Sequence, residues 1–438
     1  MSADNVADLL GEGAPDDGHS VDLVGWAVRQ LIDEMRDASP DELPEVLTRA
    51  VAVLGATEPI VYLADLQQRN LVPFRPGTVI HEESPRVLGI DSTVAGRAFQ
   101  HSEALRGGPV LRADAGTEPM WLPLLDGSER VGVLGLVVDG WWLREDARLR
   151  ALESFAAVVA ELVVTKTLYG DSIVSARRTS EMTLAAEVQW SLLPPLTFVG
   201  RSVTVAGGLE PAYEVAGDSL DYAVDAGVTR FGVFDGMGHG IVSAQLISLV
   251  VAAYRNARRS GRSLAATAAH IEAAVGHVFG SEAFTTGLVC ELDNVTGQLT
   301  WISAGHHEPL LLREGRLVRS LTVEPLLPFG LNQELGGALP AAVGSEQLEP
   351  GDVLLLHTDG VTDARSPSGE YFGQDRLIDS MSRALAADLP AAETMRRLVH
   401  ALLAHRDGQL DDDATLLMVR WHGPGRTDDV LGAGHESR

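Results

Sequence analysis

Apolar and polar positions divide the chain into a helix-rich first half and a strand-rich second half. Near the start, Leu23, Ala27 and Leu31 recur at four-residue spacing, which is typical of one face of a helix. Between residues 44 and 165, helical stretches mix with short apolar runs such as "PIVYLAD" and "RVGVLGLVVDG", which have the length of strands. From residue 203 to residue 421, strand-like runs dominate, among them "QLTWISAG", "DVLLLHTDG" and "TLLMVRW".

Short turns in this second half fix how its strands pair. Asn294–Gly297 and Glu314-Gly315 each lie between two strand-like runs, and connections this short require antiparallel neighbours. Long apolar helices intervene, such as "GIVSAQLISLVVAAYRNA" and "AAETMRRLVHALLAHRDG". The pattern predicts a layered α+β architecture.

A chain of 438 residues is too long for one ordinary domain. The composition along the chain predicts five segments, which are listed here in order. They are a disordered start (1–20), a first domain with its leading helix (21–165), a helical linker (166–200), a second domain (201–422) and a polar tail (423–438).

Composition and charge exclude several classes of protein. The formal net charge is -27, from 61 acidic against 34 basic residues, which argues against nucleic acid or an anionic membrane as the main partner. Cys290 is the one cysteine, so an internal disulfide and a multi-cysteine metal site are excluded, and a reducing cytoplasmic location fits. The N-terminus lacks a signal peptide, and the most apolar run, residues 241–254, is too short to span a membrane.

The helical region from Glu145 to Leu193 connects the two halves and has two interpretations. Apolar positions including Leu149, Leu152 and Val159 form a stripe close to the 3.5-residue repeat of a coiled coil. Such a helix either packs on its own domain or pairs across a homodimer and links a sensor to an effector.

Four stretches of the second half place aspartates where a strand ends. They are "AGDSLD" (Asp218, Asp221), "FDGMGHG" (Asp235), "HTDGVTDA" (Asp359, Asp363) and "DDDAT" (Asp411, Asp412, Asp413). Each alone is explained by a turn or a helix cap. Several carboxylates gathered at the rim of a sheet would repel one another and be costly to bury. Divalent cations such as Mg²⁺ or Mn²⁺ relieve that repulsion, and a pair of them can activate water for attack at phosphorus.

These stretches, taken in order, resemble the SpoIIE branch of the metal-dependent protein phosphatases, the protein phosphatase 2C superfamily. The resemblance covers residues 185–421 and also includes "VQWSLLPP", "GQLTWISAGHHEPLLL" and "YFGQDRL". It implies an antiparallel β-sandwich flanked by helices, an α-β-β-α phosphatase fold. It also implies that water activated by two Mn²⁺ or Mg²⁺ ions hydrolyses phosphoserine or phosphothreonine without a phosphoenzyme.

The resemblance assigns roles to positions that match the family pattern. Asp218 would bind one ion, Asp235 would bridge both, and Gly236 would offer its carbonyl. Asp359 and Asp412 would complete the second ion's ligands. Asp221, Asp413 and His239 are second-tier candidates, whereas Asp363 and Asp411 are expected to be peripheral. No residue is assigned to substrate binding.

Several residues depart from the family pattern or stay undecided. Ala216 and Leu220 replace a usual glycine and aromatic residue, and Asp363 replaces a common glutamate. Arg365 is the one basic residue flanking the metal motifs. His306 is interpreted as packing its loop, and neither His306 nor His307 as a zinc ligand.

The first domain resembles a GAF sensor domain in the order and texture of its elements, including "STVAGRAFQHSEAL" and "MWLPLLDGSERVGVLGLVVDG". This resemblance implies regulation by an input, a small molecule or a protein, that the sequence does not name. The resemblance to the SpoIIE branch implies that the substrate is a phosphorylated STAS-type anti-sigma-factor antagonist, whose dephosphorylation would free a sigma factor in stress signalling.

Two alternatives to an active phosphatase have distinct signatures. A degenerate phosphatase that only captures its partner would be consistent with Ala216 and Leu220, but the metal-ligand aspartates are intact. A haloacid-dehalogenase phosphatase, a P-loop enzyme and a diguanylate cyclase each need a motif that the sequence lacks.

Overall fold

The computed structural model describes residues 17–76, 86–111, 113–210, 213, 217–331, 341–408, 410 and 412–424, with side chains from residue 23. The chain divides into two compact units, residues 1–179 and residues 180–438. Ala216 and Asp411, named above, lie outside the described residues. No helix within the described ranges combines the length and apolar character needed to cross a bilayer.

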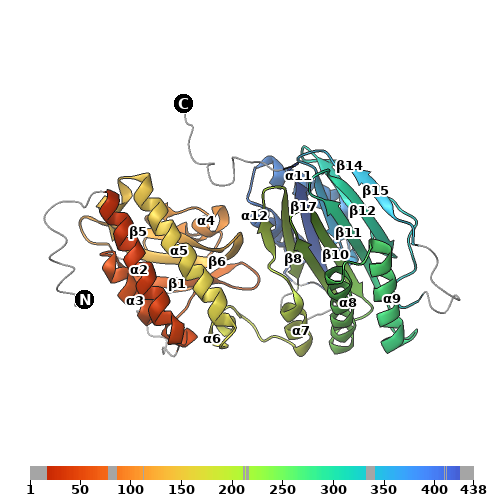
Figure 1. The fold of residues 1–438 in the computed structure, drawn as a ribbon, viewed down its shortest axis with the longest axis horizontal. Coiled ribbons are helices and arrows are strands. Elements are labelled where there is room, and N and C mark those ends of the chain that lie inside the picture. The colour runs from red at the N-terminus through yellow and green to blue at the C-terminus, as the bar shows by residue number, and fades with distance from the viewer. Residues whose placement is uncertain are drawn as a thin grey trace. The chain divides into compact units, whose positions relative to one another are not determined.

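The first unit is built on one antiparallel sheet (Figure 1), and the pairing of its strands gives the order β3-β2-β1-β6-β5-β4. Its strands are β1 (Thr57–Ala64), β2 (Asn70–Pro73), β3 (Leu88–Gly89), β4 (Leu105–Arg106), β5 (Thr117–Asp126) and β6 (Glu129–Asp139). Its helices are α2 (Asp17–Asp37), α3 (Leu43–Val53), α4 (Val94–His101), α5 (Asp146–Thr167) and α6 (Ser172–Ala176), with 3₁₀ turns at Pro40–Glu42 and Gly140–Leu143.

Helices cover both faces of this sheet. Residues of α2, α3 and α5 share one apolar core with one face of the sheet, and α4 packs on the other face through Ala98 and Phe99. The stripe on α5 lies inside the first of these cores, where Leu152, Phe155 and Val159 are fully buried. The stripe therefore packs on its own unit, and its interpretation as a dimer seam is wrong, because these side chains are already covered.

Residues 166–200, expected as a helical linker, are divided between the two units. Lys166 Nζ donates a hydrogen bond to Ala38 O (2.6 Å), and Arg177 Nε donates one to Ala64 O (2.9 Å), so this part is anchored to the first unit. Helix α7 (Leu184–Leu192) belongs to the second unit.

The second unit is a sandwich of two antiparallel sheets. One sheet has the order β15-β12-β11-β10-β9 and the other the order β14-β13-β16-β17-β8-β7. The strands are β7 (Thr197–Val199), β8 (Val203–Glu210), β9 (Asp218–Val224), β10 (Val228–Gly236), β11 (Thr285–Asp293), β12 (Gln298–Ala304), β13 (Leu310–Arg313), β14 (Arg316–Ser320), β15 (Gly344–Gln347), β16 (Val353–His357) and β17 (Ala414–Trp421). The helices besides α7 are α8 (Ile241–Arg259), α9 (Leu264–Phe279), α10 (Asp359–Thr362), α11 (Gly373–Ala386) and α12 (Ala391–His405).

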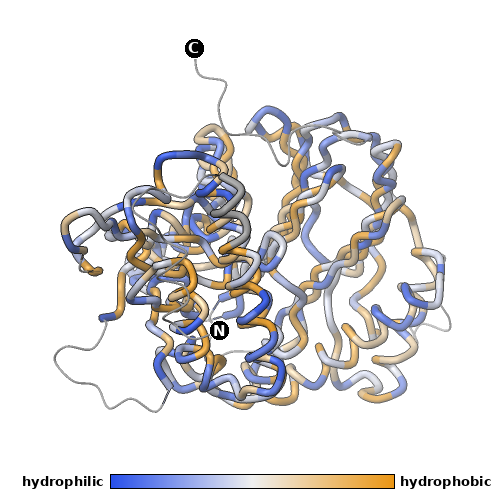
Figure 2. Tube along the Cα trace, turned by 60° about the vertical axis from the view of Figure 1, so that its left-hand side comes forward, coloured by the Kyte–Doolittle hydropathy of each residue, from blue (hydrophilic) through white to orange (hydrophobic). Residues whose placement is uncertain are grey.

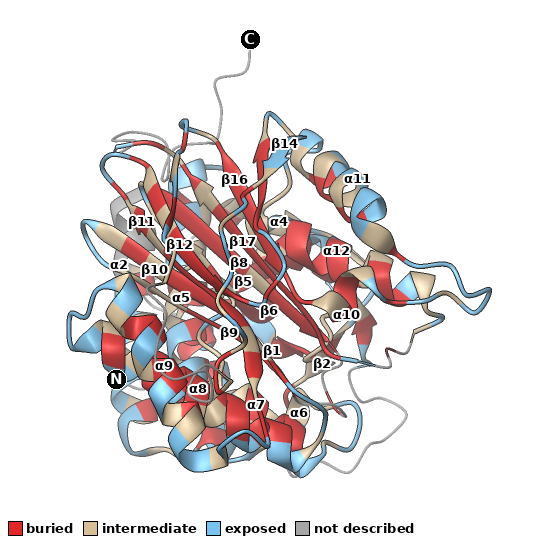
Figure 3. Ribbon diagram, turned by 90° about the vertical axis from the view of Figure 1, so that its right-hand side faces the viewer, coloured by how far each residue is buried: buried red, intermediate tan, exposed pale blue. Residues whose placement is uncertain are grey.

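Three apolar layers hold this sandwich together. One core lies between the sheets, a second joins α8 and α9 to the first sheet, and a third joins α11 and α12 to the second sheet. The central strands are buried almost throughout, whereas the edge strands β14 and β15 and the outer helices have exposed positions (Figure 3). Apolar positions follow the strands, and polar ones gather in the connecting loops (Figure 2). The predicted α+β class and the helix-flanked antiparallel sandwich are confirmed.

The predicted hairpin turns are present and have identifiable causes. The Asp293 carboxylate accepts hydrogen bonds from the backbone of Val295 (2.9 Å) and Thr296 (2.8 Å), which closes the β11–β12 turn. Glu314 and Gly315 both have positive φ (51° and 71°), as a two-residue hairpin between β13 and β14 requires.

Candidate active site at the strand ends of the two sheets

The first sheet brings two of the predicted aspartates together. Asp218 begins β9, Asp235 lies one residue before the end of β10, and the two residues are directly opposite in the antiparallel pairing. Opposite residues of such a pair project from the same face of the sheet. The two carboxylates are therefore neighbours.

The second sheet delivers its strand ends to the same place. Thr358, which follows β16, donates a hydrogen bond from Oγ1 to Asp218 Oδ2 (2.6 Å). The hydroxyl oxygen of Thr358 in turn accepts a hydrogen bond from the backbone N–H of Thr415 on β17 (2.9 Å). Asp359 comes next in the chain and opens the short helix α10. This contact joins the ends of β9, β16 and β17.

Asp413 is the buried anchor of the cluster. Its Oδ2 accepts hydrogen bonds from the backbone N–H groups of Gly217 and Asp218 (3.0 Å to the latter) and from Gln189 Nε2 (3.2 Å). Gln189 also donates to Asp218 O (2.8 Å), so helix α7 is attached directly to the cluster. Asp413 Oδ1 is buried and has no hydrogen-bond partner among the described residues. Asp412, in contrast, is exposed.

Glycines allow the backbone segments to approach one another. A Cβ on Gly360 would lie 1.8 Å from Asp413 O, so no other residue fits after Asp359. A Cβ on Gly236 would meet Gly217 O at 3.0 Å. Gly238 has a φ of +81°, a conformation that other residues rarely adopt.

The carboxylates of the cluster lie close enough to repel one another. Burial first, and then repulsion from the carboxylates of Asp359, Asp412 and Asp413, together raise the pKa of Asp235 to about 7. Burial is also the main cause of the raised pKa of Asp413, about 6, and of the raised pKa of Asp218. Within the described residues, no three acid, histidine or cysteine side chains already surround a single point as a closed metal cage would.

The donor chemistry nevertheless fits divalent cations. The side chains of Asp218 and Asp235 have threonine hydroxyls as hydrogen-bond partners, and neither forms an ion pair with a described arginine, lysine or histidine. Hard oxygen donors, one of them the buried and unsatisfied Asp413 Oδ1, are the ligands that Mg²⁺ and Mn²⁺ prefer.

Asp221 occupies a different environment from the other aspartates. It is buried on β9 and forms ion pairs with Arg255 (2.9 Å) and Arg258 (2.7 Å) on helix α8. Side chains three positions apart on a strand project from opposite faces, so Asp221 faces the helix layer while Asp218 faces the second sheet. The sequence alone could have shown this difference, because two aspartates three positions apart on a strand must project from opposite faces of the sheet.

The remaining sequence candidates lie around the cluster. His239 and Asp363 have exposed side chains, and Leu220 is buried in the core between the sheets. Arg365 contacts the ring of Tyr371 and donates a hydrogen bond to its hydroxyl.

His306 supports the cluster through one threonine. Its Nδ1 and the hydroxyl of Thr286 are 2.8 Å apart, and that hydroxyl lies 3.5 Å from Asp235 Oδ2. Burial lowers the pKa of His306 to about 3, so the ring is neutral. His307 stacks on His357 with ring centroids 5.3 Å apart.

Two sheets flanked by helices, with aspartates gathered at their converging strand ends, form the arrangement that the resemblance to the protein phosphatase 2C superfamily implies. Residues 225–422 match the family model described as stage II sporulation protein E (SpoIIE). This part of the chain is therefore similar to the SpoIIE family. Asp218 and helix α7 lie before the matched residues, and the match does not extend to the first unit, whose GAF-like character stays a prediction.

Two curated relatives and one solved structure are similar to part of the chain. The chain is 31% identical over 138 residues to Protein IcfG of Synechocystis, a match to 31% of this chain and 20% of that protein. It is 24% identical over 241 residues to the phosphoserine phosphatase RsbU of Bacillus subtilis, covering 55% of this chain and 70% of RsbU. The SiaA-PP2C domain of Pseudomonas aeruginosa is 22% identical and covers 54% of this chain and 94% of that domain, with a TM-score of 0.44. The chain thus spans about a fifth of the first of these relatives.

Proposed function

We propose that this protein is a metal-dependent serine/threonine protein phosphatase that hydrolyses phosphoserine or phosphothreonine on a regulatory protein. The observation that carries the proposal is the meeting of Asp218, Asp235, Asp359 and Asp413 at the strand ends of both sheets. The matched SpoIIE family model and the phosphoserine phosphatase RsbU among the relatives support the same activity.

Two divalent cations, Mn²⁺ or Mg²⁺, fit this cluster. Asp218, Asp235 and the carbonyl of Gly236 would hold one ion, and Asp235, Asp359 and Asp412 would hold the other. Bound cations of this kind activate water and neutralise charge on a phosphoryl group. Asp413 would orient the site, because its carboxylate accepts hydrogen bonds from the backbone N–H groups of Gly217 and Asp218.

The surroundings of the cluster suit a protein substrate. The loop after β10 is exposed at Met237, Gly238 and His239, so a phosphorylated side chain can approach the carboxylates from solvent. Exposed apolar residues adjoin this loop at Ile241 and Val242. The substrate class that we propose is a phosphorylated anti-sigma-factor antagonist of STAS type.

Regulation by the first unit is part of the proposal. A GAF-like unit would receive a small-molecule or protein input, and helix α7 would transmit it, because Gln189 bonds both Asp218 O and Asp413. We propose that the active form is a homodimer, joined by surfaces other than the buried α5 stripe. Light scattering that gives a monomer in a fully active preparation would remove the dimer from the proposal.

The test is phosphate release from a phosphoserine-bearing protein in the presence of Mn²⁺. We expect Asp235→Asn to lower kcat by at least roughly a hundredfold, because it removes the bridging ligand of both ions. Asp379→Asn on α11 is the matched control, since Asp379 is 61% exposed and should leave the rate unchanged. Equal rates for wild type and Asp235→Asn would refute the assignment. A wild type that binds Mn²⁺ and yet releases no phosphate would favour a degenerate, partner-binding protein.

A further inference from the structure

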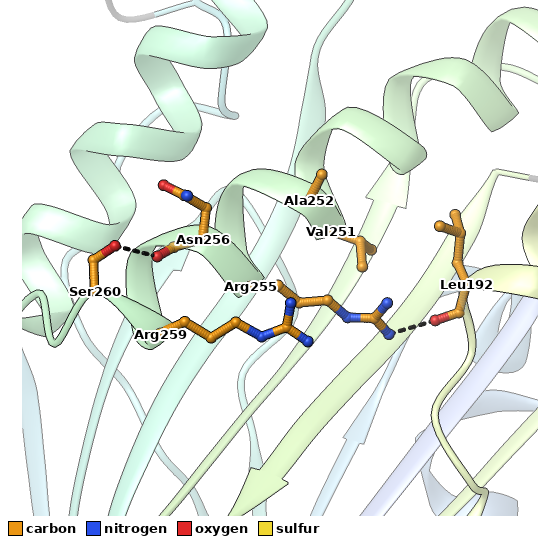
Figure 4. A pocket seen from close by; sticks show the side chains of 7 residues that line it. All are labelled: Leu192, Val251, Ala252, Arg255, Asn256, Arg259 and Ser260. Atoms are coloured by element: carbon orange, nitrogen blue, oxygen red, sulfur yellow. Dashed lines mark hydrogen bonds between the residues drawn. The ribbon is translucent and has the colours of Figure 1, made fainter.

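A pocket lies between the end of helix α7 and the last turns of helix α8, away from the aspartate cluster. Its volume is about 420 Å³, which is within the range of small-molecule sites. Leu192 lines it on the α7 side, and Arg255, Asn256, Arg259 and Ser260 line it on the α8 side (Figure 4). None of the described lining residues is acidic.

The charge around this pocket is opposite to that of the whole chain. Arg255 and Arg259 line the pocket, and Arg258 lies beside Arg259 on α8 without lining it. Asp221 pairs with Arg255 and Arg258. Three positive charges against one negative charge leave a local excess of two, in a chain with a net charge of -27. Such an excess attracts anions.

Arg259 supplies the uncompensated charge. It is exposed and has no hydrogen-bond or ion-pair partner among the described residues. It lies one turn after Arg255, and Figure 4 shows both guanidinium groups on the same side of the pocket, directed toward Leu192. Like charges at this spacing repel, and an anion between them would reverse the sign of the interaction.

The dipole of helix α8 explains the positions of only some of these arginines. Cations in the last turn of a helix complement its dipole, and that accounts for Arg258 and Arg259. It does not account for Arg255, which lies a turn earlier, has only 24% of its side chain exposed, and donates a hydrogen bond to Leu192 O.

We propose that this pocket binds a small ligand through a phosphoryl group, held between Arg255 and Arg259. The planar guanidinium presents paired donors that match phosphate oxygens, and Nη1 of Arg255 has no hydrogen-bond partner among the described residues. Asn256 and Ser260 add polar groups at the rim. Inorganic phosphate and a phosphomonoester are two sources of the same chemistry.

Occupation of the pocket acts on the aspartate cluster through α7. Arg255 fixes the carbonyl of Leu192 at the end of this helix, and Gln189 on the same helix bonds Asp218 O and Asp413. A ligand that orders Arg255 therefore stabilises α7 in its position on the cluster. The effect on catalysis rests on the proposed function, whereas the binding site does not.

Calorimetry on metal-free protein, dialysed free of chelator, tests the site separately from catalysis. Without cations the aspartate cluster repels anions, so heat from added phosphate or glycerol 2-phosphate reports on the pocket. We expect saturable one-to-one binding of at least one of these probes to the wild-type chain. Arg259→Gln should weaken it roughly tenfold or more, the value of one charge-assisted hydrogen bond.

Arg262→Gln is the matched control, because Arg262 is an exposed arginine in the next loop and does not line the pocket. It should bind as wild type does. Hydrogen exchange of residues 184–192 should slow when the probe binds to the wild type and stay unchanged in Arg259→Gln. Failure of both probes to bind, equal binding by Arg259→Gln, or an equal loss in Arg262→Gln would overturn the proposal.

Discussion

Asp221 provides a test of whether an aspartate beside the cluster serves the fold or the metal. The change is Asp221→Asn, which keeps the shape of the side chain and removes its charge. Asp221 is 1% exposed and pairs with Arg255 and Arg258, whose side chains are 24% and 10% exposed. The variant leaves two largely buried guanidinium groups without a counter-charge.

The structure allows the cost to be estimated. Removing one partner of a buried ion pair costs about 3–5 kcal/mol. Arg255 keeps its hydrogen bond to Leu192 O, and Arg258 stays over the ring of Tyr254 at 5.2 Å. Both arginines also retain some solvent, so we expect the lower end of the range, about 3 kcal/mol.

The assay combines stability with metal affinity. Urea unfolding, followed by hydrogen exchange of peptides from β10 and β16, reports the free energy of unfolding of the second unit. Asp225→Asn is the matched control, because Asp225 lies in the β9–β10 hairpin, is 67% exposed and pairs with Arg230 at 3.6 Å. An exposed pair of this kind contributes about 0–1 kcal/mol. Mn²⁺ affinity should be the same in both variants and in the wild type.

One pattern of results would refute this reasoning. If Asp221→Asn is as stable as Asp225→Asn but binds Mn²⁺ more weakly, Asp221 is a metal ligand and its ion pairs are incidental.

Two other predictions concern the cluster itself. In metal-free protein, the pKa of Asp235 is raised from 3.8 to about 7 in the folded state, so folded protein holds more protons than unfolded protein between these values. The free energy of unfolding should therefore fall as the pH rises from about 4 to about 7. We expect a fall on the order of 2 kcal/mol, because the repulsion is distributed over several carboxylates. Calorimetric melting at pH 5 and pH 8 checks this, and a melting temperature that rises with pH would contradict it, as would a failure of Mn²⁺ to restore stability at pH 8. Gln189→Ala removes the donor shared by Asp218 O and Asp413, so we expect a loss of about 1–2 kcal/mol and weaker Mn²⁺ binding in a titration. Ser191→Ala, an exposed change on the same helix, is its control, and equal Mn²⁺ affinities would show that Gln189 does not position the site.

The sequence predicted the sheets and the gathering of the aspartates for local reasons. Turn residues such as Glu314-Gly315 and the apolar runs before Asp235 and Asp359 are signals that lie within a few residues of the feature they predict. The ranking of Asp412 above Asp413 came from the family pattern alone, because adjacent acids look alike until the fold buries one of them.

Other features depend on contacts that the sequence does not display. Gln189 reaches Asp413 across 224 positions, and a glutamine on a helix carries no sign of such a partner. The α5 stripe was ambiguous because the periods of a core-facing helix and a coiled coil differ by only a tenth of a residue. The pocket beside Leu192 is lined by residues of two helices, and the sequence does not show that these residues lie together.

The position of β17 in its sheet has a consequence for how the protein is made. It is the last described strand in the chain, yet it lies between β16 and β8 in the middle of its sheet, and Asp413 directly precedes it. On the ribosome, about two hundred residues are therefore synthesised after β8 before its partner β17 appears. Pairing at such long separation folds slowly and leaves strand edges open to chaperones. A truncated translation product that stops before β17 lacks both the centre of one sheet and Asp413, so the sheet and the aspartate cluster are completed together at the end of synthesis.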